Sequence, residues 1–306
     1  MSHSGHMTDP PPAAPSAEPA TSTAGSAAGS ATSSTVGSPV LEVGAAPATR
    51  RAWWAELLAH REVLMVLARK DFQTRYKRAT LGIVWAVAVP LLQGAVMAVV
   101  FSRVVSFTTG ADFGAYVIGG IMAWSYFAAT LSTATSAIVD ASSLTDKVWF
   151  PRILLVLVPA MANTVGLVIS FTVLVALLPV LDAGMGLRLA LLAPAMALLI
   201  AFTMALSLVL SALYVYFRDV KFLVQAALLV WLYVTPIVYY QDQFDGAGWL
   251  DLNPMTGVVE LFRIATVGGD GDWARAVGVT VVTTMLLAVA GVEAHRRHDR
   301  LFVDQL

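Results

Sequence analysis

Residues able to do chemistry are scarce in this chain of 306 residues, and they form no familiar catalytic pattern. None of the four lysines, Lys70, Lys77, Lys147 and Lys221, follows a glycine, which excludes a Walker A phosphate-binding loop. There is no His-Glu-x-x-His zinc motif, no Gly-x-Ser-x-Gly nucleophile motif and no cysteine. We therefore expect a chain that is not an enzyme and that binds no metal or cofactor itself.

The histidines sit where ligand chemistry is not expected. His3 and His6 lie in residues 1–49, an Ala-, Ser-, Thr-, Pro- and Gly-rich tail without apolar periodicity, which we predict to be disordered. His295 and His298 belong to a basic stretch near the C-terminus, and we expect both to be solvated.

Composition indicates a membrane protein. The chain is 58% hydrophobic and 13% charged, whereas soluble domains carry roughly 25% charged residues. Its net charge of -1 gives no global basic field for binding nucleic acid, so no nucleic-acid partner is expected.

Six apolar segments are long enough to cross a bilayer, which takes about 20 residues. They run approximately over residues 81–105, 115–139, 153–181, 187–216, 222–240 and 276–292. Acidic residues are nearly absent from them, and their polar residues are mainly Gln93, Asn163, Gln225 and hydroxyls. Because ion-coupled carriers usually place ionisable groups within the membrane, the energy for any transport is expected to come from elsewhere. The predicted fold is an all-α polytopic membrane protein.

Two of these regions have further features. The second segment is rich in Gly, Ala, Ser and Thr, which lets helices approach closely, so we predict that it is packed inside the bundle. Before the last segment, Asn253 and Pro254 predict the start of a short helix. Its apolar residues suggest a re-entrant or interfacial element that dips into the outer leaflet: Val258, Val259, Leu261 and Phe262.

A basic run fixes the predicted orientation. It contains Arg69, Lys70, Arg75, Lys77 and Arg78, directly before the first apolar segment. With six spans and both termini in the cytoplasm, the outer segments hold four basic residues and the inner ones 15 of the 19. This bias satisfies the positive-inside rule.

Two cytosolic surfaces are candidates for contact with a partner. Residues 50–80 predict one amphipathic helix lying against the membrane, followed by a transmembrane domain over residues 81–306. Between the second and third spans, Asp146, Lys147, Trp149 and Phe150 form a compact loop. The two aromatic residues suit a protein interface, and an aromatic belt at the membrane surface explains them nearly as well.

Five stretches at matching positions resemble the ABC-2 type permeases that export polysaccharides, a family that includes O-antigen, teichoic acid and galactan exporters. They are Arg69 through Trp85, Asp146 through Arg152, Tyr216 through Lys221, Thr235 through Tyr239, and Leu252 through Arg263. The resemblance covers residues 50–306. It implies a homodimer in the cytoplasmic membrane of a bacterium, joined to two copies of a separate P-loop ATPase that binds ATP and Mg.

The resemblance also implies roles for particular residues. Those at the ATPase-coupling contact would be Asp146, Lys147, Trp149, Phe150 and Arg152. Those on the cytosolic gate and interface helix would be Arg69, Arg75, Tyr76, Lys77 and Arg78. A lipid-linked glycan would pass between two permeases, and candidate stacking surfaces for it are Tyr116, Trp124, Tyr126, Phe127, Trp231, Tyr233 and Tyr239. Bundle packing or an interfacial belt also accounts for each of these aromatics.

Other functions remain open from the sequence. An ABC-2 permease for a small amphiphile, such as a drug or a lipid, would have the same apolar spans. A membrane-embedded acyl- or glycosyltransferase would need clustered His, Asp or Glu at a membrane face, and the sequence offers no such cluster. A self-energised channel or carrier would transport without an ATPase.

Overall fold

The computed structural model describes residues 50–77, 82–104, 112–141, 150–181, 183–184, 186–240, 247–268 and 273–298. All of them belong to one compact unit, Val43–Leu306. Helices joined by turns, bends and short irregular stretches make up this described part, and it contains no strand, so the predicted all-α fold is confirmed. The predicted disordered tail, residues 1–49, lies outside it.

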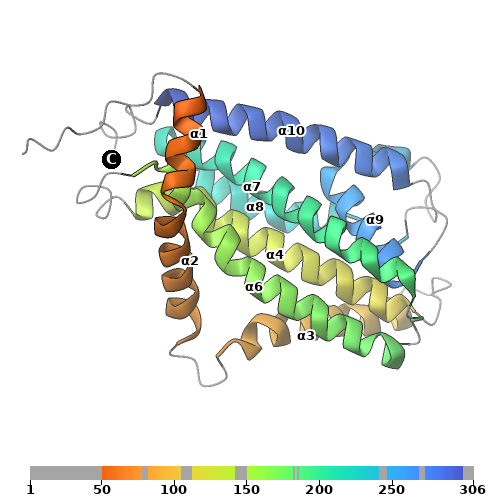
Figure 1. Cartoon of the computed structure of the whole chain (residues 1–306). Coiled ribbons are helices and arrows are strands. Elements are labelled where there is room, and N and C mark those ends of the chain that lie inside the picture. Colours follow the sequence, from red (N-terminus) through yellow and green to blue (C-terminus); the bar gives the residue numbers. More distant parts are fainter. Residues whose placement is uncertain are drawn as a thin grey trace, which may run out of the picture. The chain divides into compact units, whose positions relative to one another are not determined.

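Among the described residues, five helices are long and apolar enough to cross a membrane. They run side by side in Figure 1 and are α3 (Val84–Val104), α4 (Phe113–Asp140), α6 (Ile153–Leu177), α7 (Leu192–Tyr216) and α10 (Trp273–His298). We call the end of the bundle where α4 ends and α6 begins the inner end, because the charge rule predicts that it faces the cytoplasm. The opposite end is the outer end.

The fifth predicted span is shorter than expected. Helix α8 (Val220–Val234) has 15 residues and ends well before Tyr240, because Thr235 adopts an extended conformation in front of Pro236. The hydroxyl of Tyr116 on α4 then donates to the carbonyls of Pro236 and Tyr239 and holds the non-helical chain. The prediction that a helix continues over residues 235–240 is therefore wrong.

Helix α4 is the centre of the bundle. It packs against α3, α6, α7, α8 and α9 (Pro254–Thr266). In its most apolar stretch 72% of the residues are buried, against 17% in α3 and in α10. The prediction that the second span is packed inside the bundle is confirmed, and small residues explain the close packing: the Cα of Ile118 lies 3.0 Å from the position of a Cβ at Gly94.

Short elements close the outer end: η1 (Leu178–Leu181), η2 (Leu187–Leu191), η4 (Ala247–Leu252) and α9 (Pro254–Thr266). Helix α9 starts as predicted, with Pro254 at its first position and the Asn253 side chain accepting a hydrogen bond from the backbone N–H of Met255 at 3.1 Å. Its apolar residues are Val258, Val259, Leu261 and Phe262, and all are buried. They pack within the protein, and the position of α9 relative to the outer leaflet stays a prediction.

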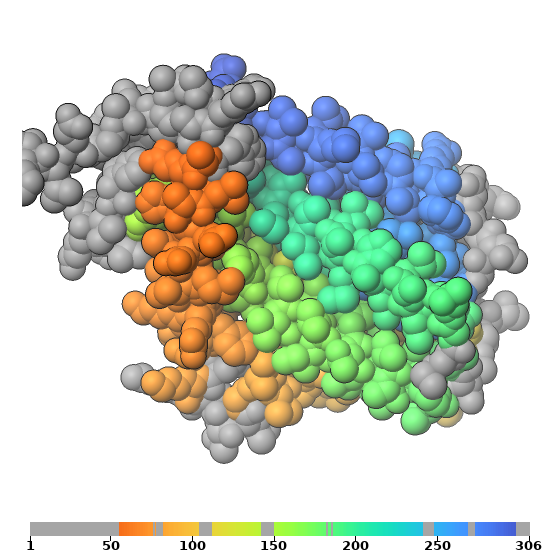
Figure 2. Space-filling model, viewed as in Figure 1, coloured from red at the N-terminus to blue at the C-terminus, as the bar shows by residue number. Residues whose placement is uncertain are grey.

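The predicted interface helix is two helices, α1 (Arg50–Ala59) and α2 (Arg61–Tyr76). The break comes at His60, whose ring Nδ1 bonds to the Glu56 carbonyl at 2.8 Å and so satisfies a backbone group at the end of α1. Both helices lie across the inner ends of the long helices (Figures 1 and 2). On this side Leu57, Leu64 and Leu67 pack against Phe150 and the first turn of α6.

His295 is not solvated, in contrast to the sequence-based expectation. It is 2% exposed near the inner end of α10. Its Nδ1 lies 2.9 Å from the Gly291 carbonyl and its Nε2 lies 3.4 Å from the hydroxyl of Ser211 on α7. Close packing of α10 on α7 explains this burial, since a Cβ at Gly291 would lie 2.6 Å from the Leu208 Cβ. The His298 side chain lies outside the described residues.

Candidate functional site

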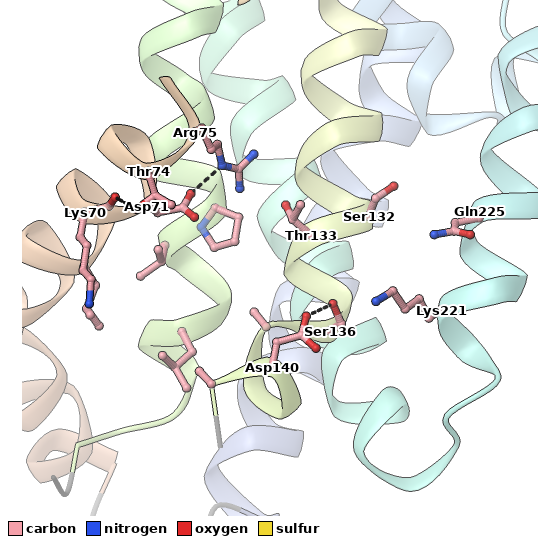
Figure 3. Close-up of a pocket in the computed structure, with 16 residues that line it drawn as sticks. Lys70, Asp71, Thr74, Arg75, Ser132, Thr133, Ser136, Asp140, Lys221 and Gln225 are labelled. Atoms are coloured by element: carbon pink, nitrogen blue, oxygen red, sulfur yellow. Dashed lines mark hydrogen bonds and ion pairs between the residues drawn. The ribbon is translucent and has the colours of Figure 1, made fainter. Parts of the chain in front are cut away.

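A polar pocket of about 620 Å³ opens at the inner end of the bundle (Figure 3). Four helices supply its walls: α2, α4, α6 and α8. Its polar lining residues are Lys70, Asp71, Thr74, Arg75, Ser132, Thr133, Ser136, Asp140, Lys221 and Gln225. Apolar side chains of α2, α4 and α6 complete the wall, including Leu67, Leu155 and Pro159. We call this cavity the inner pocket.

Helix α2 contributes an arginine that is tied to the bundle. The Nε of Arg75 donates to the Asp71 carboxylate at 2.9 Å, and its Nη1 donates to Asn163 Oδ1 at 3.1 Å. The Asn163 amide in turn donates to the hydroxyl of Thr130 on α4 at 3.0 Å. A continuous hydrogen-bonded chain therefore joins the interface helix to α6 and α4.

Helix α4 contributes a polar face. Ser132, Ser136 and Asp140 are four residues apart and so share one side of the helix, with Thr133 beside them. Ser136 donates to the Asp140 carboxylate at 2.6 Å, and Thr133 donates to the Ala129 carbonyl at 2.9 Å. Each of these two hydroxyls donates its proton within its own helix, and Ser132 lines the pocket beside them.

Helix α8 contributes Lys221 and Gln225 from the opposite side. In Figure 3 the Lys221 ammonium points toward Ser136 and Asp140, while Arg75 approaches α4 from α2. Within the described part of the chain, neither Lys221 nor Lys70 forms an ion pair with a neighbouring side chain. Three cations therefore share the inner pocket with two carboxylates, one of which already binds Arg75.

The predicted gate residues lie in different surroundings. Arg75 lines the inner pocket, whereas Arg69 and Lys77 are exposed on α2 and its C-cap. The Tyr76 side chain and Arg78 lie outside the described residues.

Of the predicted coupling residues, two can be placed. Phe150 is 5% exposed and packs against Leu154 and Leu155 of α6 and against Leu64 of α2. Arg152 is buried at the start of α6. Asp146, Lys147 and Trp149 lie outside the described residues. Phe150 therefore links the predicted coupling loop to the predicted interface helix by direct packing.

The predicted channel aromatics fall into two groups. Trp124, Phe127 and Trp231 come together in the core, where Phe127 stacks on Phe202 at 5.7 Å and meets Trp231 edge-on at 5.3 Å. Phe202 was not predicted, although its place in an apolar span is compatible with core packing. Burial in one chain favours the packing interpretation for this group, and lining of a channel stays a prediction.

The remaining aromatics lie toward polar partners or the surface. Tyr116 is buried and holds the chain after α8, and Tyr126 lies 3.4 Å from the Ala160 carbonyl. Tyr239 is partly buried, and its hydroxyl lies 3.3 Å from two carbonyls at the end of α8. Tyr233 is 60% exposed.

Sequence reasoning missed how the inner pocket is assembled. Asn163 and Gln225 were noted only as polar residues inside spans. Lys221 was noted only among the four lysines and as the last residue of a stretch that resembles the family. The spacing of Ser132, Ser136 and Asp140 was a usable signal, because it places polar groups on one side of an otherwise apolar helix. In the ranges that the structure describes, no three histidine, aspartate or glutamate side chains gather in a way that could hold a metal ion.

Comparison with known proteins identifies the family. Residues 62–267 match the family described as ABC-2 type transporter. An O-antigen export system permease protein RfbA of Klebsiella pneumoniae is 25% identical over 253 residues, which are 80% of this chain and 95% of that protein; a second one from the same species is 24% identical over 254 residues. The protein of the same name from Myxococcus xanthus is 27% identical over 212 residues, which are 68% of this chain and 81% of that protein. Since the family match spans more than half of the sequence, the chain belongs to the ABC-2 type transporter family.

Proposed function

We propose that this chain is the transmembrane subunit of an ATP-binding-cassette exporter that moves a lipid-linked cell-surface polysaccharide outward across the cytoplasmic membrane of a bacterium. Its relatives are O-antigen export permeases by name, which supports a polysaccharide as cargo. The chain carries no Walker A sequence, so a separate P-loop ATPase supplies the energy.

The observation that carries this proposal is the uncovered polar side of α4. Around α4, helices α3, α6, α7 and α8 pack in turn, but α3 and α8 share no substantial contact in the described part of the chain. The side of α4 left between them carries Ser125, Ala129, Ser132 and Thr133, none of which is buried. This side leads into the inner pocket, so small and hydroxyl-bearing groups follow one face of a membrane helix, as a glycan path requires.

A second copy of the chain is the proposed cover of this face. Gln93 on α3 and Gln225 on α8 are both exposed, although they belong to otherwise apolar helices. An exposed amide in hydrocarbon is costly, because it loses its hydrogen bonds to water. A homodimer that encloses a hydrated path along α4 gives both amides polar surroundings.

The proposed ATPase contact is the surface formed by α2 and the loop before α6. Phe150, directly before α6, packs against Leu64 and Leu67 of α2, and Arg75 of α2 bonds to Asn163 in the bundle. A partner that displaces α2 would thereby shift the inner pocket and α4. Two permeases and two ATPases complete the proposed assembly.

Export by the reconstituted complex tests the proposal. The chain and its P-loop ATPase are placed in inverted membrane vesicles, and ATP-dependent accumulation of radiolabelled polymer inside the vesicles is measured. We expect accumulation with the intact ATPase and none with an ATPase whose Walker A lysine is replaced by alanine. Accumulation without any ATPase would indicate a self-energised carrier, and uptake of small amphiphiles but not of polymer would overturn the assignment of cargo.

A further inference from the structure

Helix α6 contains a proline in its inner half, at the level where the hydrophobic core of the bundle is divided. Pro159 lies inside the continuous helix Ile153–Leu177. We propose that Pro159 is a hinge about which the first turns of α6 move together with α2, and that the hydrogen bond between Arg75 and Asn163 is the latch that keeps this hinge closed. This inference rests on the proposed function for the force that opens the latch.

The proline weakens α6 at one point. Pro159 has no backbone N–H, so it cannot donate to the Leu155 carbonyl, and its ring crowds that carbonyl. One residue later, the Ala160 carbonyl accepts from the hydroxyl of Thr164 at 2.7 Å, and the hydroxyl of Tyr126 on α4 lies 3.4 Å from it. Side-chain hydroxyls that bond to helix carbonyls help a helix to bend. Both features make this the point where α6 bends most easily.

The buried apolar residues of α6 belong to different clusters on the two sides of Pro159. Before the proline, residues 153–156 pack with the inner ends of α4 and α7 or with Phe150. After it, the residues of α6 in the main core run from Leu167 to Leu174. Close-packed clusters resist internal rearrangement, so a movement within the bundle is expected at the boundary between two of them.

Polar residues occupy this boundary on the neighbouring helices. Thr130 on α4 and Asn163 on α6 are bonded to each other there. On α7, Thr203 and Ser207 lie between the buried residues of the main core and those of the inner cluster, and both are 0% exposed. The Ser207 hydroxyl has no hydrogen-bond partner among the described residues. Short polar side chains at this level favour small sliding movements of the packed helices.

Helix α2 holds α6 on both sides of the hinge. Near the start of α2, its leucines pack against Phe150 and the first turn of α6, before the proline. Near its end, Arg75 donates to Asn163, one turn after the proline, at 3.1 Å, and also binds Asp71 on its own helix. Single hydrogen bonds between membrane helices are weak. Displacement of α2 therefore breaks the bond to Asn163 first, and α6 then bends at Pro159 and carries its wall of the inner pocket with α2.

Hydrogen–deuterium exchange of the purified full-length chain in detergent tests the hinge without the ATPase or the polymer. The quantity measured is the exchange rate of the backbone N–H groups of residues 153–158. Pro159→Ala restores the missing backbone donor, so we expect this exchange to slow by at least about threefold. Asn163→Leu removes the latch, and we expect the same exchange to become about threefold faster.

Two variants of α6 separate the latch from a general change in stability. Asn163→Asp keeps an acceptor for Arg75, so exchange should stay within about twofold of that in the unaltered chain. Thr172→Val removes an exposed hydroxyl that donates to the Val168 carbonyl of its own helix, and should leave the exchange unchanged. Equal acceleration in Thr172→Val and Asn163→Leu, or none in Asn163→Leu, would overturn the latch.

A second proline is the control for the hinge. Pro90 lies inside α3, so Pro90→Ala also restores a backbone donor in a long helix. It should leave the exchange of residues 153–158 unchanged. Equal slowing in Pro90→Ala and Pro159→Ala, or no slowing in Pro159→Ala, would overturn the hinge.

Polymer export separates the hinge from a purely structural role. In inverted vesicles with the ATPase, Pro159→Ala should lower the export rate by at least about tenfold, because a conformational step then limits the cycle. Its thermal stability should be equal to that of the unaltered chain or higher, since a proline inside a helix is unfavourable. Full export, or a loss of export together with a loss of stability, would overturn the hinge. Absence of ATP-dependent export by the unaltered chain, with the exchange results as expected, would instead remove the proposed function.

Discussion

Polar side chains at the two ends of the helix bundle differ in their hydrogen bonding. At the outer end, the Trp231 indole donates to Asn253 Oδ1 at 2.8 Å, and the Asn253 amide donates to the Thr235 hydroxyl at 3.1 Å. At the inner end, Lys221 and Gln225 face a cavity and bond to no described side chain. Polar groups that form hydrogen bonds with one another stabilise a fixed structure. Polar groups without a protein partner can bind water or a ligand. The Trp231–Asn253–Thr235 cluster therefore favours a fixed structure, whereas Lys221 and Gln225 in the inner pocket are open to water or a ligand.

The largest expected effect concerns the aromatic core that supports the outer half. Phe127 is 0% exposed and contacts Phe202 and Trp231, so Phe127→Ala leaves a cavity that the neighbouring rings cannot fill. We expect the free energy of unfolding to fall by about 3–5 kcal/mol, measured in detergent by thermal or chemical denaturation.

Tyr233→Ala is the control for this core, because Tyr233 is 60% exposed and its loss should change stability by less than about 1 kcal/mol. If Phe127→Ala costs no more than this control, Phe127 faces open space and the channel-lining interpretation gains support over core packing.

The second-largest expected loss of stability concerns the close packing of α9 on α10. A Cβ at Gly257 would overlap the Thr280 hydroxyl and the Ala276 carbonyl. Thr280 is held in place because its hydroxyl donates to the Pro254 carbonyl at 2.6 Å. Gly257→Ala should therefore lower the free energy of unfolding by about 1–3 kcal/mol, as overpacking does in other cores.

Gly278 is the matched glycine, since a Cβ there meets nothing within 4 Å. Gly278→Ala in the interior of α10 should be neutral or stabilise by up to about 1 kcal/mol. Similar effects of the two substitutions would mean that α9 and α10 are not in close contact at the outer end.

A smaller effect is expected at the link between α2 and the bundle. Asn163→Leu removes the link between Arg75 and Thr130. Hydrogen bonds between membrane helices contribute about 0.6 kcal/mol on average and at most about 1.7. A double-mutant cycle with Arg75→Gln should give a coupling energy in this range, and an additive pair would show that α2 is not tied to the bundle through Asn163.

Local patterns were sufficient for part of this architecture. Small residues in the second span predicted the buried α4, and Asn253 with Pro254 predicted the start of α9. Both depend on residues that are near in sequence: close helix packing in the first case and a helix cap in the second.

The failures have different causes. The early end of α8 had a local signal in Thr235 before Pro236 that the predicted segment overlooked, and Tyr116, about 120 residues away in the sequence, bonds to the carbonyls that follow this helix. Burial of His295 depends on α7, and the inner pocket depends on α8 placing Lys221 opposite α4. Hydrophobic periodicity identifies an apolar helix but does not say which helix will lie beside it, so contacts between distant segments escape it.

The smallest expected change in the free energy of unfolding is that of Lys221→Gln, in the inner pocket. Lys221 binds no described partner, so Lys221→Gln should change the free energy of unfolding by no more than about 0.5 kcal/mol. Thermal denaturation of the purified chain measures this directly, with Phe127→Ala as the positive control. A loss above about 1 kcal/mol would mean that Lys221 stabilises the folded chain. The contrast between a closed outer end and an open inner end would then fail, because both ends would use their polar groups for structure.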